Sequence, residues 1–129
     1  MDRRPKILVV EDEHLNRKVL ETLLKGENQV FLAKDGEQAL KRAEETPDLD
    51  LILLDLVMPG TDGYEVLRRL KTMNGVKDIP VIIITALGSR ESEALGFELG
   101  AVDYVRKPFN PDIVKERVEA HLARGGQRA

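Results

Sequence analysis

Asp55 is the residue whose position most strongly indicates chemistry, because its carboxylate directly follows the apolar run Leu51–Leu54. A charged group at the end of a buried strand costs free energy unless it is paired or binds a cation. Three other expected strand ends carry polar groups: the acids Glu11 and Asp12, the hydroxyl of Thr85 and the ammonium of Lys107. Together these groups would form a magnesium-dependent site for phosphoryl chemistry.

Several oxygen atoms could bind a Mg²⁺ ion at this edge, since Mg²⁺ prefers oxygen ligands in near-octahedral geometry and usually keeps several waters. The carboxylates of Asp12 and Asp55 could each supply one oxygen. Glu11 could act directly or through a bound water, and the backbone carbonyl of Val57 could supply a further ligand. Because clustered carboxylates repel one another, we expect the empty site either to hold a cation or to raise a carboxyl pKa.

Asp55 could also act as a nucleophile, since carboxylates form aspartyl-phosphates in several classes of enzyme. Catalysis of phosphoryl transfer depends mostly on positioning and on neutralising charge. Magnesium, the ammonium of Lys107 and the hydroxyl of Thr85 would together contact the three equatorial oxygens of the phosphoryl group.

The composition is ordinary for one soluble globular domain. The 129 residues are 42% hydrophobic and 33% charged, and one domain of this length buries a sizeable core. The net charge of -3 argues against a general nucleic-acid binder, and the absence of cysteine excludes disulfides and thiolate metal sites. The short apolar run after the basic N-terminus is too short for a signal peptide or a membrane span. We therefore expect a cytoplasmic protein.

Apolar runs and helical periodicities alternate along the chain. Strands are predicted at residues 6–10, 29–33, within 48–55, 81–85 and 101–106. Helices are predicted at residues 14–25, from 35 to about 45, from 62 through 70, at 89–99 and from 111 through 122. The expected helix N-caps are Asp35, Asp62, Ser89 and Asn110. Gln38 and Glu65 would complete capping boxes with the first two.

This alternation predicts five βα units and a doubly wound α/β fold of three layers. Strands that read as continuous Val, Ile and Leu runs are buried on both faces, as in a five-stranded parallel sheet covered by helices. Ligands of such folds bind outside the carboxyl ends of the strands, where the acids and the lysine lie. We expect a tail at residues 1–5, one domain at 6–124 and a second tail at 125–129.

Four segments in this order are highly specific, although each alone would be weak: Ile7–Glu13, Leu53–Gly60, Ile84–Ala86 and Tyr104–Phe109. They resemble the receiver domain of bacterial two-component response regulators, and the likeness covers residues 6 to about 122. The resemblance implies a flavodoxin-like (βα)5 fold and a role in phosphorelay signalling. It implies a phosphoacceptor domain with Mg²⁺-dependent self-phosphorylation and self-dephosphorylation, rather than an enzyme in its own right.

The resemblance also assigns roles to individual residues. Asp55 would accept a phosphoryl group from a phosphohistidine of a sensor histidine kinase or a histidine phosphotransfer protein. Glu11 and Asp12 would bind Mg²⁺. Lys107 would contact the phosphoryl group, and its peptide bond to Pro108 would be cis.

In such domains phosphorylation draws the hydroxyl matching Thr85 inward, and the ring matching Tyr104 follows it. The face formed by the fourth helix, the fifth strand and the fifth helix would then bind a downstream protein or an output domain, or form a phosphorylation-dependent homodimer. We expect no direct DNA binding and no membrane partner. The positions that influence hydrolysis in receivers hold the apolar residues Val57 and Leu87 here, which predicts slow self-dephosphorylation.

Other interpretations remain open at this stage. The chain could be a phosphorylation-independent interaction module, or a receiver fragment of a larger regulator or hybrid kinase. A haloacid-dehalogenase-like phosphatase would need a second acid where Val57 stands, and a dinucleotide-binding domain would need a glycine-rich first turn. Gly60 and Gly63 are expected to serve turn geometry and close backbone approach, whereas His14 and His121 lack clustered partners and are interpreted as surface residues.

Overall fold

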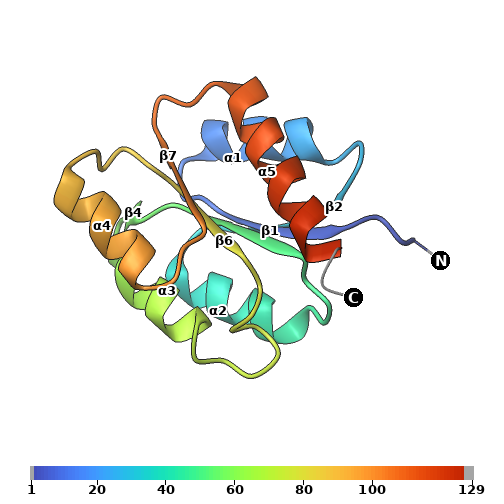
Figure 1. The fold of residues 1–129 in the computed structure, drawn as a ribbon, viewed down its shortest axis with the longest axis horizontal. Helices are drawn as coiled ribbons and strands as arrows, with labels where there is room; N and C mark the ends of the chain where they lie inside the picture. Colours follow the sequence, from blue (N-terminus) through green and yellow to red (C-terminus); the bar gives the residue numbers. More distant parts are fainter. Residues whose placement is uncertain (1, 127–129) are drawn as a thin grey trace.

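A computed structural model describes residues 2–126 of the chain (Figure 1). The main sheet consists of β1 (Lys6–Val10), β2 (Gln29–Ala33), β3 (Leu51–Leu54), β6 (Val81–Thr85) and β7 (Asp103–Arg106). A separate short hairpin consists of β4 (Val57–Met58) and β5 (Thr61–Asp62). The helices are α1 (His14–Leu24), α2 (Gly36–Glu45), α3 (Gly63–Leu70), α4 (Arg90–Glu98) and α5 (Pro111–Gly126).

The strand order β2-β1-β3-β6-β7 brings the expected site residues to one edge of the sheet. Every neighbouring pair in this sheet is parallel. Val10 pairs with Leu54, and Leu54 pairs with Ile83, so β1, β3 and β6 end side by side. The chain moves outward from β1 to β2 and then crosses to β3 on the other side. The carboxyl ends of β1 and β3 therefore flank the point where the strand order reverses, which is where such folds bind ligands.

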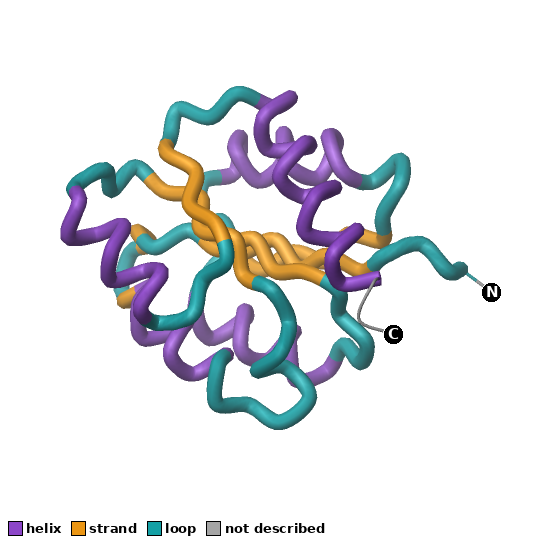
Figure 2. The backbone as a smooth tube through the Cα atoms, viewed as in Figure 1, coloured by secondary structure: helices purple, strands orange, loops and turns teal. Residues whose placement is uncertain are grey.

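Successive strand residues point into two separate cores, one on each face of the sheet. Leu8, Val10 and Ile52 belong to the core beneath α2 and α3, which also includes residues of α2, α3 and β6. Ile7 and Val9 belong to the opposite core, which is shared with α1 and α5. Figures 1 and 2 show α1 and α5 together on one side of the sheet and α2, α3 and α4 on the other. The predicted three-layer, flavodoxin-like fold is confirmed.

The helix N-termini follow the predicted capping residues. The side chain of Asp35 accepts a hydrogen bond from the N–H of Gln38, and that of Asp62 accepts one from Tyr64. Ser89 and Asn110 accept from residues 92 and 112 in the same way. The expected capping boxes are only partly formed: the side chain of Gln38 accepts from the N–H of Lys34 rather than from Asp35. In the second box, the carboxylate of Glu65 instead pairs with the guanidinium groups of residues 68 and 69.

Two element boundaries differ by two or more residues from the sequence-based expectation. β3 lies within the expected range 48–55, but β7 begins at Asp103 instead of residue 101, after Gly100 (φ 112°) turns the chain. The hairpin β4–β5 was not predicted, because each of its strands has only two residues and such short strands carry no periodic signal. α5 continues to Gly126, two residues into the segment expected to be a tail, while residues 127–129 of that segment lie outside the described residues. Within the described range, no helix is both long enough and apolar enough to cross a membrane.

The two glycines expected to serve turn geometry do so in different ways. Gly60 has a φ of 69°, a left-handed conformation that L side chains rarely adopt. At Gly63 an added Cβ would lie 2.3 Å from the Cα of Leu56. The first turn of α3 therefore approaches the backbone that follows Asp55, and the N–H of Gly63 donates to the Leu56 carbonyl at 3.1 Å. These contacts fix the chain directly after the carboxylate of interest.

Candidate functional site

The carboxylate of Asp55 lies at the end of β3 and is held from both sides. Only 3% of the residue is exposed. Its N–H donates to the carbonyl of Val10 at 3.0 Å, which continues the sheet by one step beyond β3. Its Oδ1 accepts a hydrogen bond from the N–H of Val57 at 3.0 Å, and its Oδ2 accepts one from Nζ of Lys107 at 2.7 Å. The carboxylate orientation is therefore fixed by the hairpin β4–β5 and by the loop after β7.

Lys107 reaches two carboxylates at once. Its Nζ lies 2.7 Å from Oδ2 of Asp55 and 2.6 Å from Oε1 of Glu11. Its N–H donates to the carbonyl of Thr85 at 2.8 Å, and its peptide bond to Pro108 is cis, as expected. Burial disfavours the ammonium, but the two carboxylates outweigh this effect and raise the pKa of Lys107 above its usual value. Lys107 is therefore a charged group aimed into the site.

Glu11 is buried and incompletely satisfied. It is 1% exposed, and its Oε2 accepts a hydrogen bond from the N–H of Glu13 at 3.1 Å. Its Oε1 forms an ion pair with the Lys107 ammonium at 2.6 Å, and among the described residues no other group donates a hydrogen bond to this buried oxygen. Burial raises the pKa of Glu11, opposed by Lys107 and reinforced by the charge of Asp55. A second cation beside this buried oxygen would be favourable, because it would give the oxygen a further partner.

Glu11, Asp12 and Asp55 form a cluster with the donor chemistry of a magnesium site. Each offers a carboxylate oxygen, and these oxygens all lie within 4.8 Å of one another. Asp12 is partly exposed, whereas the other two are buried, so the cluster opens to solvent on one side. An all-oxygen set with an open side suits Mg²⁺, which keeps several waters. The residues fit the ion that the sequence predicts, although the carbonyl of Val57 as a further ligand stays a prediction.

Thr85 and Tyr104 meet at the backbone of one residue, Leu87. Thr85 is fully buried at the end of β6, and its hydroxyl accepts from the N–H of Leu87 at 3.4 Å. The hydroxyl of Tyr104 donates to the carbonyl of Leu87 at 2.6 Å. Tyr104 is only 9% exposed, so its ring already lies inward, with the ring of Phe97 at a centroid distance of 6.4 Å. Burial is the main cause that raises the pKa of Tyr104 to about 12.

Two features of the structure were missed by sequence reasoning. Arg17, which was not singled out, donates from Nη1 to the carbonyls of Glu11 and Asp12 at 2.9 and 3.1 Å. The prediction that His121 is a surface residue is wrong: it is 9% exposed, and its Nε2 lies 3.1 Å from Oδ2 of Asp103. Its position three residues after the buried Val118 would have placed it on the inward face of the helix. His14 is exposed, as expected, and its Nδ1 lies 3.3 Å from Nη2 of Arg17.

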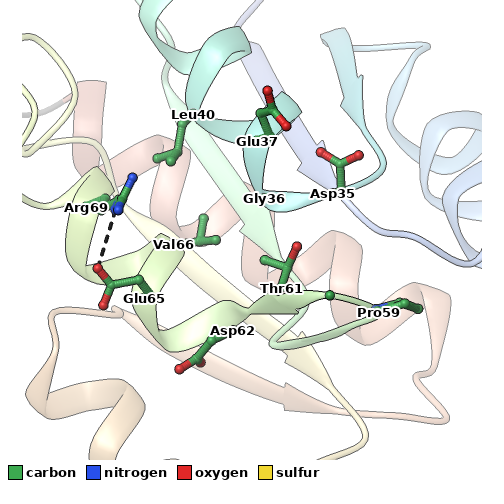
Figure 3. A pocket seen from close by; sticks show the side chains of 11 residues that line it. Asp35, Gly36, Glu37, Leu40, Pro59, Thr61, Asp62, Glu65, Val66 and Arg69 are labelled. Carbon is green, nitrogen blue, oxygen red and sulfur yellow. Dashed lines mark hydrogen bonds and ion pairs between the residues drawn. The ribbon is translucent and has the colours of Figure 1, made fainter.

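A groove lies between the N-terminal turn of α2, the hairpin β4–β5 and α3 (Figure 3). Acidic side chains surround it, but Asp35 and Asp62 cap helices, and Glu65 pairs with Arg69. None of the groups that surround the Asp55 carboxylate lines this groove. This groove is therefore separate from the acidic cluster at the strand ends, where the sequence predicts the phosphoryl site.

Comparison with known proteins agrees with the class that the fold and the site define. A receiver-domain protein from Methanospirillum hungatei JF-1, described as CheY-like, superposes with a TM-score of 0.90 over 98% of this chain and 99% of that one. At 24% sequence identity, this likeness shows the fold. The family model of the response regulator receiver domain matches residues 7–119. The chain belongs to the response regulator receiver family of two-component systems.

Relatives in this family come from several kinds of regulator. The transcriptional regulatory protein ResD of Bacillus subtilis is 45% identical over 123 residues, which cover 95% of this chain and 50% of that protein. A probable cyclic di-GMP phosphodiesterase of Vibrio cholerae is 42% identical over 116 residues, 90% of this chain and 26% of that protein. The BeF3-activated receiver domain of DrrB, a Thermotoga maritima protein, is 36% identical, with a TM-score of 0.84 over 93% of this chain and 98% of that one. The chain spans 50% of the length of ResD and 26% of the length of the Vibrio cholerae protein.

Proposed function

We propose that this domain accepts a phosphoryl group on Asp55 in a Mg²⁺-dependent reaction with the phosphohistidine of a sensor kinase or a histidine phosphotransfer protein. The observation that carries the proposal is the placement of a 3% exposed carboxylate within 2.7 Å of the Lys107 ammonium, inside an acidic cluster. An oxygen of Asp55 would bond to phosphorus while the phosphorus–nitrogen bond breaks. The electron pair of that bond would remain on the imidazole nitrogen.

The residues around Asp55 would act by positioning and by neutralising charge. The N–H of Val57 orients the carboxylate. The ammonium of Lys107, which contacts the carboxylate before transfer, would contact the phosphoryl oxygens after it. When bound by Glu11, Asp12 and Asp55, Mg²⁺ would supply the positive charge that a dianionic donor needs. Such a domain is a signalling module whose own reaction is its modification, rather than an enzyme acting on a separate substrate.

Exposed apolar side chains on α1 and α5 suit docking of the phosphoryl donor. Leu15 and Val19 of α1 are 66% and 36% exposed, and Ile113 of α5 is 40% exposed. Val19 and Lys107 line the same pocket, so Val19 borders the acceptor site. A helical partner that covers these side chains would bring its phosphohistidine to Asp55 and exclude water from the transfer.

We propose that the output face consists of α4, β7 and α5. Leu95 and Phe97 of α4 are 37% and 44% exposed, and Val102 before β7 is 37% exposed. Thr85 and Tyr104 connect this face to the site through the backbone of Leu87. A phosphoryl group that recruits the Thr85 hydroxyl would remove the acceptor of the Leu87 N–H and alter the loop before α4. The altered face would bind a downstream protein, an output domain or a second copy of the domain.

The relatives suggest that the domain works inside a longer regulator. ResD and the Vibrio cholerae protein extend well beyond the matched region, and their names describe a transcriptional regulator and a phosphodiesterase. We propose that the receiver itself does not contact DNA, since its net charge is -3. Contact with DNA or with a second messenger would then belong to an attached domain, and the domain would act in the cytoplasm.

Intact mass after incubation with acetyl phosphate and Mg²⁺ tests the proposal. The wild-type protein should gain one phosphoryl group, and Asp55→Asn or an excess of chelator should abolish the gain. If neither acetyl phosphate nor a phosphorylated kinase domain modifies the wild-type protein, the domain is a phosphorylation-independent interaction module.

A further inference from the structure

Arg17 of α1 holds the backbone of the two acids that begin the loop after β1. One nitrogen, Nη1, donates to the carbonyl of Glu11 at 2.9 Å and to that of Asp12 at 3.1 Å. The other terminal nitrogen, Nη2, lies 3.3 Å from Nδ1 of His14. Arg17 is partly buried. A single charged side chain thus bridges two consecutive peptide groups.

These two carbonyls would otherwise be free to turn. Strand β1 ends at Val10, and beyond it the N–H of Glu11 still donates to the carbonyl of Ala33 at 3.0 Å. Among the described residues, no backbone N–H outside the regular elements donates to the carbonyl of Glu11 or Asp12. The direction of each carbonyl fixes the peptide plane on one side of each Cα, and therefore limits where the attached carboxylate can point.

We propose that Arg17 is a positioning residue for the magnesium site, acting through the backbone of Glu11 and Asp12. Its two hydrogen bonds hold the carboxylates of these residues within 4.8 Å of Asp55, the spacing that one small cation requires. Charge-assisted bonds to carbonyls are stronger than neutral ones, so a guanidinium suits this role. The inference rests on the proposed function, because it assumes that the cluster binds Mg²⁺.

The charge of Arg17 makes the inference separable from simple electrostatics. A positive side chain beside a cation site repels the incoming ion, so removing it should strengthen Mg²⁺ binding if charge alone matters. Losing the clamp should instead weaken binding, because residues that orient metal ligands typically contribute about 10- to 100-fold to metal affinity. The two explanations therefore predict changes of opposite sign for Arg17→Gln.

The experiment is a calorimetric titration of the wild type, Arg17→Gln, Arg17→Lys and Lys18→Gln with Mg²⁺. We expect the Kd to rise about tenfold or more in Arg17→Gln. Arg17→Lys keeps the charge and can still donate to carbonyls, so its Kd should lie between those of the wild type and Arg17→Gln. Lys18→Gln removes the same charge from the neighbouring exposed position of α1 and should change the Kd by less than about twofold. Amide chemical shifts at residues 11–13, recorded during the titration, locate the change.

The outcomes distinguish this inference from the proposed function. Normal wild-type binding with an unchanged or lower Kd in Arg17→Gln overturns the inference and leaves the magnesium site intact. A wild-type protein that binds no Mg²⁺ overturns the proposed site and this inference with it. If Arg17→Gln does not fold, Arg17→Lys, which retains the charge, tests the inference. A Kd equal to that of the wild type, together with unshifted amides at residues 11–13, would refute a role for the guanidinium geometry.

Discussion

The ammonium of Lys107 lies 2.7 Å from the carboxylate of Asp55, although the two residues are 52 positions apart in the sequence. The same ammonium lies 2.6 Å from Glu11, which is 1% exposed. Without a metal ion, this lysine is the cation that pairs with both buried carboxylates, so we expect it to stabilise the fold.

Replacement of Lys107 by methionine should destabilise the metal-free protein. The change leaves Asp55 and Glu11 buried without their cation, and breaking a buried pair in this way typically costs about 3 to 5 kcal/mol. Since Lys107 retains 16% exposure, we expect about 2 to 3 kcal/mol, measured by urea unfolding in the presence of a chelator. Added Mg²⁺ should restore part of the loss. Lys115→Met is the control, because Lys115 pairs at 3.7 Å with a largely exposed Glu27. Equal stabilities of the two variants would contradict this account of Lys107.

Tyr104 should ionise only under strongly alkaline conditions. Its buried hydroxyl donates to the carbonyl of Leu87, and burial raises its pKa to about 12 from an ordinary value of 10. The folded protein therefore retains a proton that the unfolded chain releases. Its contribution to stability is complete below pH 10 and is lost as the pH rises toward about 12. The absorbance of the phenolate, taken as wild type minus Tyr104→Phe, should show this late titration.

A midpoint near pH 10 in that difference spectrum would mean that the ring is exposed in solution, contrary to its inward position in the structure.

The Tyr104→Phe variant also tests the connection between this ring and the site. Tyr104→Phe removes the hydrogen bond to Leu87 but keeps the ring, so phosphorylation of Asp55 should persist while its effect on partner binding weakens. Phosphorylation measured by intact mass separates the two effects.

The fold and most of the site could be predicted because they depend on local signals. Each strand is a short apolar run, and the group that follows it lies at the carboxyl edge by the geometry of a parallel sheet. Asp55, Thr85 and Lys107 are all placed by this rule. The family resemblance added the cis bond before Pro108, which no periodicity reveals.

What the sequence did not reveal concerns the partners of polar side chains. Arg17 reads as an ordinary polar residue of an amphipathic helix, and helical periodicity does not show that the carbonyls of Glu11 and Asp12, six and five positions earlier, turn toward its guanidinium. The pairing of His121 with Asp103 joins α5 to β7, and sequence patterns do not report such long-range partners. Both misses concern polar groups that are satisfied only in the folded state.

Asp103 should stabilise the contact between β7 and α5 in a pH-dependent way. Its Oδ1 accepts from Arg117 at 2.6 Å, and its Oδ2 lies 3.1 Å from His121. Burial alone would raise its pKa, but hydrogen bonds from the Tyr104 N–H, His121 and Arg117 outweigh burial, so the pKa is lowered below 3.8. A depressed carboxyl pKa gives stability that is present above about pH 4 and is lost as the pH falls through the folded value.

Asp103→Asn should therefore lower the free energy of unfolding by about 1 to 2 kcal/mol at pH 7 and by less at pH 3. This range is reduced because Arg117 is partly exposed. Urea unfolding across this pH range measures the difference. Asp48→Asn is a matched control, since Asp48 is exposed and has a φ of 64° that asparagine also tolerates. A cost at Asp103 that does not change between pH 7 and pH 3 would show that its charge contributes nothing.

Val57 and Leu87 should make the phosphorylated state long-lived. Val57 is 50% exposed beside the acceptor, and Leu87 lies in the loop after Thr85, yet neither side chain can hydrogen-bond an attacking water. One added hydrogen bond in the transition state, worth about 1.4 kcal/mol, corresponds to about a tenfold faster reaction. Val57→Asn or Leu87→Glu should therefore shorten the lifetime of the aspartyl-phosphate by about that factor, measured by intact mass after the donor is removed. Val57→Ala, which is smaller but still apolar, separates polarity from access: if it accelerates hydrolysis as much as asparagine does, the side chain protects the phosphoryl group by covering it.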